Sequence, residues 1–267
     1  MDTIRHHFGF KKEPFPQNIA VKDLYPLPAL EPLERRIFFA LNHKSISVIT
    51  GDVGSGKSTS LRYISHKCRS SEYELISIVG GTYSTMELYR QILLNLGYSY
   101  RSYQVAPMVS KIRAIILEIA SRKVVPVLMI DEAHLLKRSV FTQLHTLAQF
   151  EFDSKPVMPI VLCGQDLLLD HLMANAVRPL ASRILGRNHL EAIKMEVMRE
   201  YLNHHTNLAG SPNRFFSDEA ILAIHQGSGG LLRKANSLAK TALLACAMEG
   251  NLTISAEHVR VASTEIF

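Results

Sequence analysis

Strand-sized apolar runs and helical spacings of apolar residues alternate along the first two thirds of the chain. The runs lie at 45–50, 75–79, 124–130 and 157–163. Between them, apolar side chains recur every three or four residues, and this periodicity predicts helices. The helices are expected over 84–96, 105–122, 139–150 and 165–186, with a further one after residue 57. Because such a βα succession is typical of a parallel sheet covered by helices, it predicts an α/β fold in three layers.

The pattern changes on both sides of this succession. Residues 1–45 combine prolines with aromatic residues, which predicts an extended lead-in packed on the core rather than a domain of its own. From residue 191 onward only helical spacings remain, broken by glycine and proline. These helices are expected over 195–208, 217–227, 231–248 and 255–263. We therefore expect a lead-in at 1–45, an α/β domain at 46–190 and a helical domain at 191–267.

Composition and length exclude several classes of protein. The chain has 267 residues, of which 47% are hydrophobic, enough for one large domain and a small second one. No apolar run approaches the roughly 18 residues that cross a bilayer, so we expect a cytoplasmic protein without membrane insertion. Three distant cysteines, Cys68, Cys163 and Cys246, favour neither a disulfide framework nor a zinc site, and they predict small buried side chains. No metal is expected apart from one bound with a nucleotide.

The segment after the first apolar run has the complete G-x-x-x-x-G-K-[ST] spacing, from Gly51 to Ser58. Its glycines allow backbone amides to surround phosphate oxygens, and the following helix adds positive potential at its N-terminus. Lys57 is expected to reach the terminal phosphates and Ser58 to ligate Mg²⁺. The predicted ligands of the nucleotide are Gly51, Asp52, Val53, Gly54, Ser55, Gly56, Lys57, Ser58, Thr59 and Asp131. The motif predicts a P-loop NTPase that uses ATP and Mg²⁺.

An acidic pair, Asp131 and Glu132, follows the strand predicted at 124–130. Ligands of parallel sheets gather at the carboxyl ends of the strands, so both acids are expected beside the nucleotide. Asp131 is assigned to Mg²⁺ together with Ser58, and Glu132 to the water that attacks the γ-phosphate. Kinases of small molecules usually lack this second acid. The pair therefore favours an ATP hydrolase.

With several shorter motifs, these features resemble the AAA+ ATPases, and more narrowly the group that contains ExeA-type secretion ATPases and transposition regulators of the MuB and TnsC kind. Besides the two nucleotide motifs, the resemblance rests on segments 7–15, 30–41, 162–165, 178–184, 201–210 and 229–233. It extends over nearly the whole chain. The resemblance implies a three-layer AAA+ domain followed by a small, all-helical lid domain.

The same resemblance implies three further site residues. Gln165 resembles the sensor that contacts the attacking water or the γ-phosphate, with a helix cap as the alternative. Arg183 resembles the finger donated to the ATP of a neighbouring subunit; Arg178 competes for this role, and a salt bridge is the alternative for both. Arg233 resembles the second sensor in the lid, although Leu232 stands where the family often has proline. The implied catalytic set is Lys57, Glu132, Gln165, Arg183 and Arg233, completed in a ring or helical filament.

Charge offers a weaker indication of the partner. The net charge is +6, and the excess of cations lies in the first half of the chain. Such an excess is compatible with a polyanionic partner or with a solvated basic surface. The candidate DNA contacts are Arg101, Lys111, Arg113, Lys137 and Arg138. The alternative is that these cations form a solvated helix face.

Two function classes follow, and a third stays open. We expect a DNA-bound ATPase whose assembly recruits or activates a transposase, because ExeA-type chains continue into a membrane span and a wall-binding region that this sequence lacks. The alternative is the ATPase module of an ExeA-type secretion or cell-envelope assembly system. The third is an ATP-driven scaffold for another protein partner.

Overall fold

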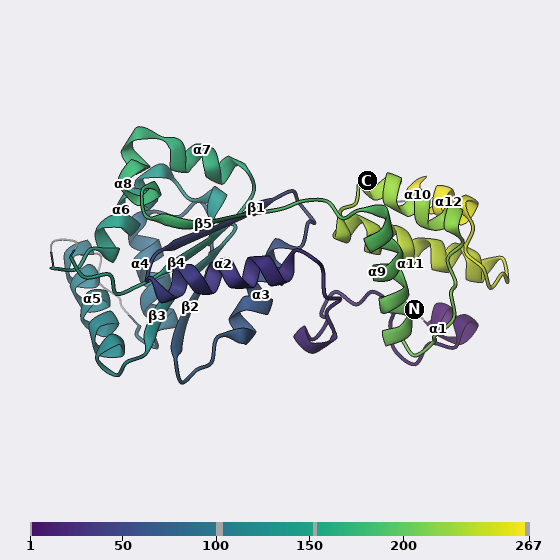
Figure 1. The fold of residues 1–267 in the computed structure, drawn as a ribbon, viewed down its shortest axis with the longest axis horizontal. Helices are drawn as coiled ribbons and strands as arrows, with labels where there is room; N and C mark the ends of the chain where they lie inside the picture. Colours follow the sequence, from purple (N-terminus) through teal and green to yellow (C-terminus); the bar gives the residue numbers. More distant parts are fainter. Residues whose placement is uncertain (1, 100–103, 152–153, 265–267) are drawn as a thin grey trace. The chain divides into compact units, whose positions relative to one another are not determined.

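Five parallel strands form one sheet in the computed structural model, which describes residues 2–99, 104–151 and 154–264 (Figure 1). The strands are β1 (Ile46–Gly51), β2 (Tyr73–Val79), β3 (Val125–Asp131), β4 (Ile160–Cys163) and β5 (Ile184–Leu190). Their order across the sheet is β2-β3-β4-β1-β5. The four strands expected from the sequence are present, each within three residues of its predicted limits. The α/β fold class is thereby confirmed.

Helices connect the strands and flank the sheet. They are α2 (Leu30–Asn42), α3 (Lys57–Lys67), α4 (Thr85–Asn95), α5 (Val105–Ser121), α6 (Arg138–Ala148), α7 (Leu167–Met173) and α8 (Arg178–Ala181). Helix α2 contacts β1 and β5, α4 contacts β2, and α5 contacts β3. Every residue of β1 and β4 is buried, as expected for central parallel strands covered on both faces.

Strand β5 is the one strand of the described residues that the sequence did not predict. The helix expected over 165–186 is instead α7, a short 3-10 turn, α8 and the start of β5. In β5, the inward positions are Gly186, Asn188 and Leu190, so two of the three are not hydrophobic. A Cβ at Gly186 would lie 2.7 Å from Ser47 Oγ, and Asn188 Nδ2 donates to the Val48 carbonyl at 3.4 Å. Because β5 lies close to β1, small and polar residues occupy its inward positions. The sequence of β5 therefore lacks the alternation of apolar and polar residues that predicts a strand.

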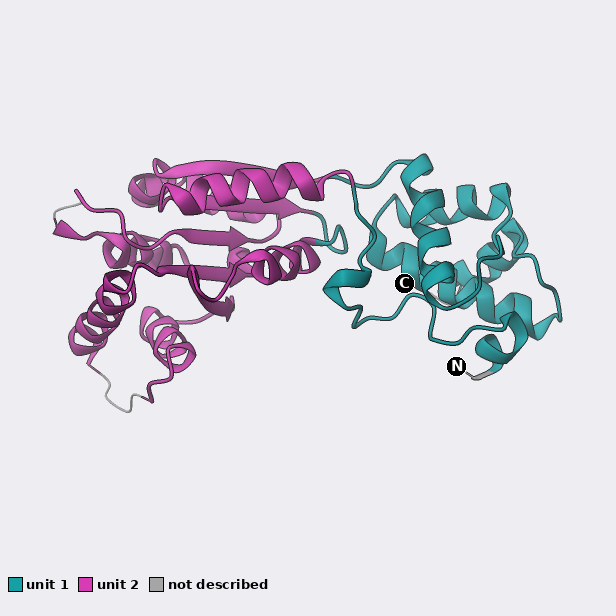
Figure 2. Cartoon of the chain, turned by 60° about the horizontal axis from the view of Figure 1, so that its bottom comes forward, with its two compact units in different colours: residues 1–27, 52–56, 191–267 teal, residues 28–51, 57–190 magenta. Residues whose placement is uncertain are grey.

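The chain divides into two compact units, coloured separately in Figure 2. Unit 2 contains the sheet and comprises residues 28–51 and 57–190, and unit 1 comprises residues 1–27, 52–56 and 191–267. The helices of unit 1 are α1 (Asp2–Phe8), α9 (Met195–Leu208), α10 (Asp218–Ser228), α11 (Leu232–Met248) and α12 (Ala256–Thr264). The four C-terminal helices lie within one residue of their predicted limits. Among the described residues, no helix is both long and apolar enough to cross a bilayer.

The aromatic residues near the N-terminus belong to the core of unit 1. The ring centroids of Phe8 and Phe10 lie 5.1 and 5.3 Å from that of Phe215, and Phe15 stacks on His205 at 4.9 Å. The structure differs here from the expectation that residues 1–45 pack on the ATPase core, because residues 1–27 share the core of the helical unit. The sequence shows that these rings must be buried, and only the fold shows which core receives them.

His205 predicts an acid-sensitive core in unit 1. Its side chain is 4% exposed, and Nδ1 has no hydrogen-bond partner among the described residues. Burial, followed by the charges of His204 and Lys240, lowers the pKa of His205 to about 4. An unfolded histidine titrates near 6.5, so the unfolded state binds more protons between these values, and stability falls as the pH drops through this window.

We expect acidification from pH 7 to pH 5 to remove roughly 2 kcal/mol of unfolding free energy through this histidine. Urea unfolding of the wild type and of His205→Leu at both pH values measures the difference. The variant is expected to lose less stability on acidification than the wild type. His66→Leu, at an exposed position near the end of α3, is the control. Equal pH dependence in wild type and His205→Leu contradicts the prediction.

Candidate nucleotide-binding and catalytic site

The carboxyl ends of three neighbouring strands meet at one edge of the sheet. β4 lies between β1 and β3, with Cys163 level with Ile49 and Leu162 level with Ile130. Neighbouring strands are about 4.8 Å apart, so groups at the ends of β1 and β3 are separated by roughly two such spacings. The two sequence motifs, which lie far apart along the chain, therefore come to the same edge.

Lys57 is held at the end of β1. It is the first residue of α3, its side chain is only 6% exposed, and its Nζ donates to the Gly51 carbonyl at 3.0 Å. Burial of an ammonium group is costly unless hydrogen bonds or an anion compensate for it. Ser58 and Thr59 follow in the first turn of α3 and are exposed. The side chains assigned to phosphate and metal thus occupy the N-terminus of an eleven-residue helix.

Residues 52–56 connect β1 to α3 and belong to unit 1. Gly54 and Gly56 have φ angles of +87° and +100°, which residues with a Cβ rarely adopt. A Cβ at Gly54 would lie 2.9 Å from the Cβ of Arg233, whose N–H donates to the Gly54 carbonyl at 3.2 Å. Ser55 Oγ is buried and has no hydrogen-bond partner within the described residues. A buried hydroxyl without a partner in a glycine-rich loop fits an anion that completes its hydrogen bonds.

The acidic pair lies where β3 ends. Asp131 is its last residue, and Asp131 Oδ1 accepts the N–H of Glu132 at 2.9 Å. Glu132 has left-handed backbone angles, with φ 50° and ψ 33°, so the chain turns sharply away from the strand there. Gly80 follows β2 and donates its N–H to the Asp131 carbonyl at 2.6 Å, and a Cβ at Gly80 would lie 2.6 Å from the Glu132 carbonyl oxygen. The close packing of these two strand ends defines the position of both acids.

Cys163 shows that the groups of both motifs converge within unit 2. Burial raises the pKa of its thiol, and the charge of Asp131 and a hydrogen bond with Asp131 raise it further. The charge of Lys57 acts in the opposite direction, and that of Glu132 makes the smallest contribution. Asp131 is the nearest of the three groups, because it contributes a hydrogen bond as well as a charge. Lys57 and Glu132 lie within range of an electrostatic interaction, which weakens with distance. The sequence predicted only that Cys163 is buried, so its place at the centre of the site is new.

The oxygen donors at this edge suit a hard divalent cation. Ser58 offers a hydroxyl and Asp131 a carboxylate, and Mg²⁺ is usually held by one or two such side chains together with phosphate oxygens and water. A cage of protein ligands is not required. The described part of the chain contains no group of three or more His, Cys, Asp or Glu side chains that would hold a metal alone. The residues therefore fit a metal that enters with the nucleotide.

Gln165 lies at the same edge, directly before α7. It is half-buried, and its backbone N–H points to the ring of His134, with 3.3 Å between N and Nδ1. The N-cap position of α7 is Asp166, and its side chain makes no capping hydrogen bond. Gln165 therefore lies beside the carboxyl end of β4, and its backbone N–H faces the same histidine ring as the carboxylate of Glu132.

Arg183 lies at the other end of the strands, where β1 and β5 begin. It precedes β5, and its carbonyl accepts the N–H of Ile46 at 3.2 Å and a hydrogen bond from the Ser45 hydroxyl, at the beginning of β1. Burial lowers the pKa of the Arg183 guanidinium. A strand of six residues spans about 20 Å, so Arg183 is remote from the Lys57 of its own chain. Its competitor Arg178 begins α8 and is exposed.

Two of the described candidate DNA contacts, Arg113 and Lys111, already contact aromatic rings of their own unit. The guanidinium of Arg113 lies 4.6 Å from the centre of the Phe150 ring, and its Nη1 donates to the Thr146 carbonyl at 3.2 Å. Lys111 is exposed and lies 4.5 Å from the ring centre of Tyr98. Lys137 and Arg138 are exposed where α6 begins, and Arg101 lies outside the described residues. The guanidinium of Arg113 thus also connects α5 to α6 through a hydrogen bond.

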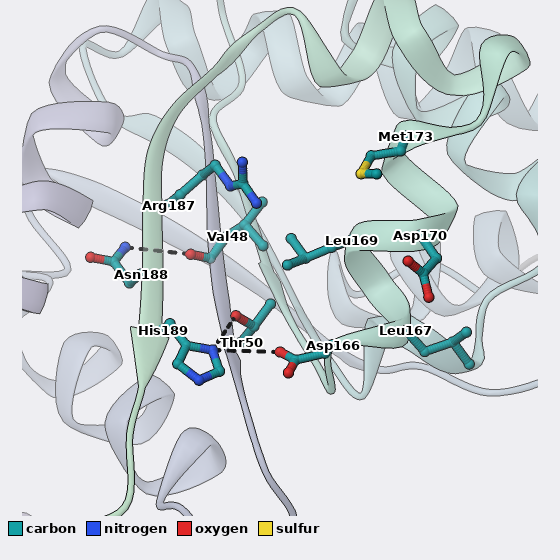
Figure 3. Close-up of a pocket in the computed structure, with 10 residues that line it drawn as sticks. All are labelled: Val48, Thr50, Asp166, Leu167, Leu169, Asp170, Met173, Arg187, Asn188 and His189. Carbon is teal, nitrogen blue, oxygen red and sulfur yellow. Dashed lines mark hydrogen bonds and ion pairs between the residues drawn. The ribbon is translucent and has the colours of Figure 1, made fainter.

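A pocket of about 520 Å³ opens between β5 and α7, beside the end of β1 (Figure 3). Its lining consists of Val48, Thr50, Asp166, Leu167, Leu169, Asp170, Met173, Arg187, Asn188 and His189. Here His189 Nδ1 lies 3.0 Å from Thr50 Oγ1 and 3.5 Å from Asp166 Oδ1. Both contacts use the same ring nitrogen, whereas a nucleophile–histidine–aspartate relay needs both nitrogens. The pocket is thus not a hydrolase triad, and its lining includes none of the predicted nucleotide ligands.

The parallel sheet of order 2-3-4-1-5, with a phosphate-type loop after β1 and an acidic pair after β3, defines a P-loop ATPase of the AAA+ class. The chain belongs to the AAA domain family, which matches residues 40–173, half of its length. Membership agrees with the fold expected from the sequence.

Individual proteins and solved structures are similar to this chain. General secretion pathway protein A of Aeromonas hydrophila is 27% identical over 268 residues, which cover 97% of this chain and 48% of that protein. This chain therefore spans about half the length of that curated relative. The structure of Cdc6p from Pyrobaculum aerophilum is similar, with a TM-score of 0.75, 17% identity and coverage of 95% of this chain and 70% of that one. Drosophila ORC bound to DNA has a TM-score of 0.66, 15% identity and coverage of 98% and 65%.

Proposed function

We propose that this chain is an oligomeric ATPase that hydrolyses Mg-ATP at the carboxyl edge of the sheet and works on DNA as a regulator of transposition. The observation that carries the ATPase part is that the strand order brings Lys57, after β1, and Asp131 and Glu132, at the end of β3, to one edge of the sheet on either side of Cys163. Two nucleotide motifs that are far apart in sequence meet there. Hydrolysis needs both motifs at the same nucleotide, because the first binds the phosphates and the second acts on the metal and the attacking water.

The residues at the edge have separate tasks in this proposal. The loop amides of 52–56 and Nζ of Lys57 bind the phosphates, and Ser58 with Asp131 holds Mg²⁺. When bound, Mg²⁺ neutralises negative charge on the phosphate oxygens. The carboxylate of Glu132 orients the attacking water and accepts its proton, as a general base does. Gln165 orients the same water or the γ-phosphate, and Arg233 acts as the second sensor.

The position of Arg183 supports the proposal of an oligomer. The backbone of Arg183 lies at the beginning of β1, about one strand length, roughly 20 Å, from the phosphate-binding end of its own sheet. Arg183 therefore serves as a finger only for the nucleotide of another subunit, where it stabilises the charge of the transition state. A ring or a helical filament places one subunit's Arg183 at the next subunit's ATP. Under this proposal ATP bridges subunits, and assembly depends on nucleotide.

DNA is proposed as the partner because the exposed cations of unit 2 suit a phosphate backbone. Lys111 lies on α5, and Lys137 and Arg138 begin α6, directly after the strand that carries the acidic pair. Such cations neutralise phosphates without reading the base sequence. A similar fold occurs in a structure that contains DNA, the Drosophila ORC complex. A transposase would then be recruited or activated by the DNA-bound oligomer in the cytoplasm.

The second candidate is an ATPase of a secretion or cell-envelope assembly system. It is favoured by the 27% identity with General secretion pathway protein A across 97% of this chain. The chemistry at the nucleotide is the same in both candidates, and the partner differs. The two are therefore separated by whether nucleotide binding creates affinity for DNA.

Filter binding of DNA with and without a slowly hydrolysed ATP analogue tests the first candidate. We expect retention only with the analogue, and a steep decrease with salt. Replacing Lys111, Lys137 and Arg138 with glutamine is expected to make the negative slope of log K against log salt less steep, by up to about 3. A matched triple variant, with glutamine at the exposed cations Arg35, Arg69 and Arg260, should keep the wild-type slope. Absence of nucleotide-dependent retention at low salt contradicts the DNA proposal and favours the secretion candidate.

A further inference from the structure

His134 is a buried imidazole located between the two strand ends that carry the proposed catalytic groups. Its side chain is 6% exposed, and it lies in the 3-10 turn Ala133–Leu135 that follows Glu132. One ring nitrogen, Nδ1, is 3.4 Å from Glu132 Oε2 and 3.3 Å from the backbone N of Gln165. A single nitrogen therefore faces a carboxylate from the end of β3 and an N–H donor from the end of β4.

These two contacts exclude each other in a neutral ring. A neutral imidazole has one nitrogen that donates and one that accepts. If the proton is on Nε2, Nδ1 accepts the N–H of Gln165, and its lone pair repels the carboxylate of Glu132. If the proton is on Nδ1, the ring donates to Glu132, and the N–H of Gln165 loses its acceptor. Both separations are longer than an optimal hydrogen bond of about 2.9 Å, as expected of a nitrogen placed between competing partners.

The fold makes room for this ring by means of a glycine. A Cβ at Gly164 would lie 3.0 Å from the backbone N of His134 and 3.2 Å from its Nδ1. Both distances are tighter than most Cβ contacts, so a side chain at 164 requires the ring or the end of β4 to shift by a few tenths of an ångström. Gly164 itself donates its N–H to the Ile49 carbonyl of β1 at 3.0 Å. The His134 ring therefore packs against Gly164, which is hydrogen-bonded to β1, the strand before the phosphate loop.

We propose that His134 is a positioning residue that makes the placement of Glu132 depend on the placement of Gln165. With its proton on Nε2, the ring holds the Gln165 backbone and leaves the Glu132 carboxylate available to the attacking water. With its proton on Nδ1, the ring holds the carboxylate and releases Gln165. The first arrangement permits hydrolysis and the second does not. This inference rests on the proposed ATPase function and adds to it a link between the general base and the first sensor.

Substitution at position 134 tests the link in the full chain. His134→Leu removes both contacts, and we expect kcat for ATP to fall at least about tenfold while KM changes by less than about threefold. His134→Asn places a carbonyl oxygen near the position of Nδ1, where it accepts the N–H of Gln165, and it is expected to restore most of kcat. Gly164→Ala displaces the ring without removing it and is expected to act like His134→Leu. His258→Leu removes another buried histidine that pairs with a glutamate, at 2.9 Å in unit 1, and should leave kcat unchanged.

Hydrogen exchange of the Gln165 amide in nucleotide-free protein provides a readout that does not depend on activity. We expect exchange at least about tenfold faster in His134→Leu than in the wild type, and near wild-type exchange in His134→Asn. Wild-type kcat together with wild-type Gln165 exchange in His134→Leu overturns the positioning role and leaves the ATPase proposal intact. A wild-type chain that hydrolyses no ATP overturns the ATPase proposal and this inference together.

Discussion

The Glu132→Gln variant is expected to hydrolyse ATP about 100- to 1,000-fold more slowly than the wild type, while its Kd for ATP changes by less than about threefold. Glutamine has the shape of glutamate, and an amide cannot accept the proton of the attacking water. The position of the side chain depends on the backbone, since Asp131 Oδ1 accepts the N–H of residue 132 and the chain is left-handed there. Both features are independent of the side-chain charge and persist in the variant.

Steady-state phosphate release measures kcat, and titration calorimetry with a slowly hydrolysed analogue measures Kd. Glu118→Gln, at an exposed position of α5, is the matched control and should behave like the wild type in both assays. Hydrolysis within tenfold of the wild type in Glu132→Gln would remove Glu132 as the general base. The nearby carboxylate of Asp131 would then be the remaining candidate on β3.

The Lys57→Met variant is expected to lose at least about 100-fold in affinity for ATP, because a charge-assisted hydrogen bond to phosphate disappears from a buried position. Methionine keeps most of the apolar stem and removes the ammonium group. Lys57 Nζ also donates to the Gly51 carbonyl at 3.0 Å, so the variant should lose about 1 kcal/mol of stability as well. The loss of binding is much the larger effect.

Calorimetry for ATP and a urea unfolding curve separate the two effects of Lys57→Met. Lys67→Met changes the lysine at the other end of α3, where Nζ lies 3.8 Å from Glu34 on the surface, and should bind ATP normally. If Lys57→Met binds ATP as the wild type does, the buried ammonium is structural. The two variants together distinguish nucleotide binding, which requires Lys57, from the chemical step, which requires Glu132.

The strands and helices that could be predicted are those with strong local patterns. Strand β1 is buried at every position and β4 likewise, so their apolar runs are unmistakable. The four C-terminal helices of unit 1 have apolar residues at regular helical spacing, and their limits were predicted within one residue. Strand β5 has no such pattern, because Gly186 and Asn188 are selected by contact with β1. Contacts with a neighbouring strand are long-range, and a local periodicity cannot record them.

The same distinction applies to the site. The phosphate loop and the acidic pair are recognisable because each needs a set of residues at consecutive positions. The places of Cys163 and His134 in the site depend on which strand ends are neighbours in the sheet. The sequence predicts only that Cys163 is buried. Arg183 is a further example, because its distance from the phosphate loop of its own chain follows from the parallel direction of β5 and β1.

The sequence by itself determined that this protein binds a nucleoside triphosphate, with Lys57 and Glu132 in separate motifs, and that helices follow an α/β part. Only the tertiary structure decided that β4 separates β1 from β3, so that a thiol and an imidazole lie among the charged groups. It also decided that the N-terminal aromatic rings join the helical unit. The physical reason is that motifs and periodicity are set by neighbours along the chain, whereas the order of parallel strands is set by packing between residues far apart in sequence.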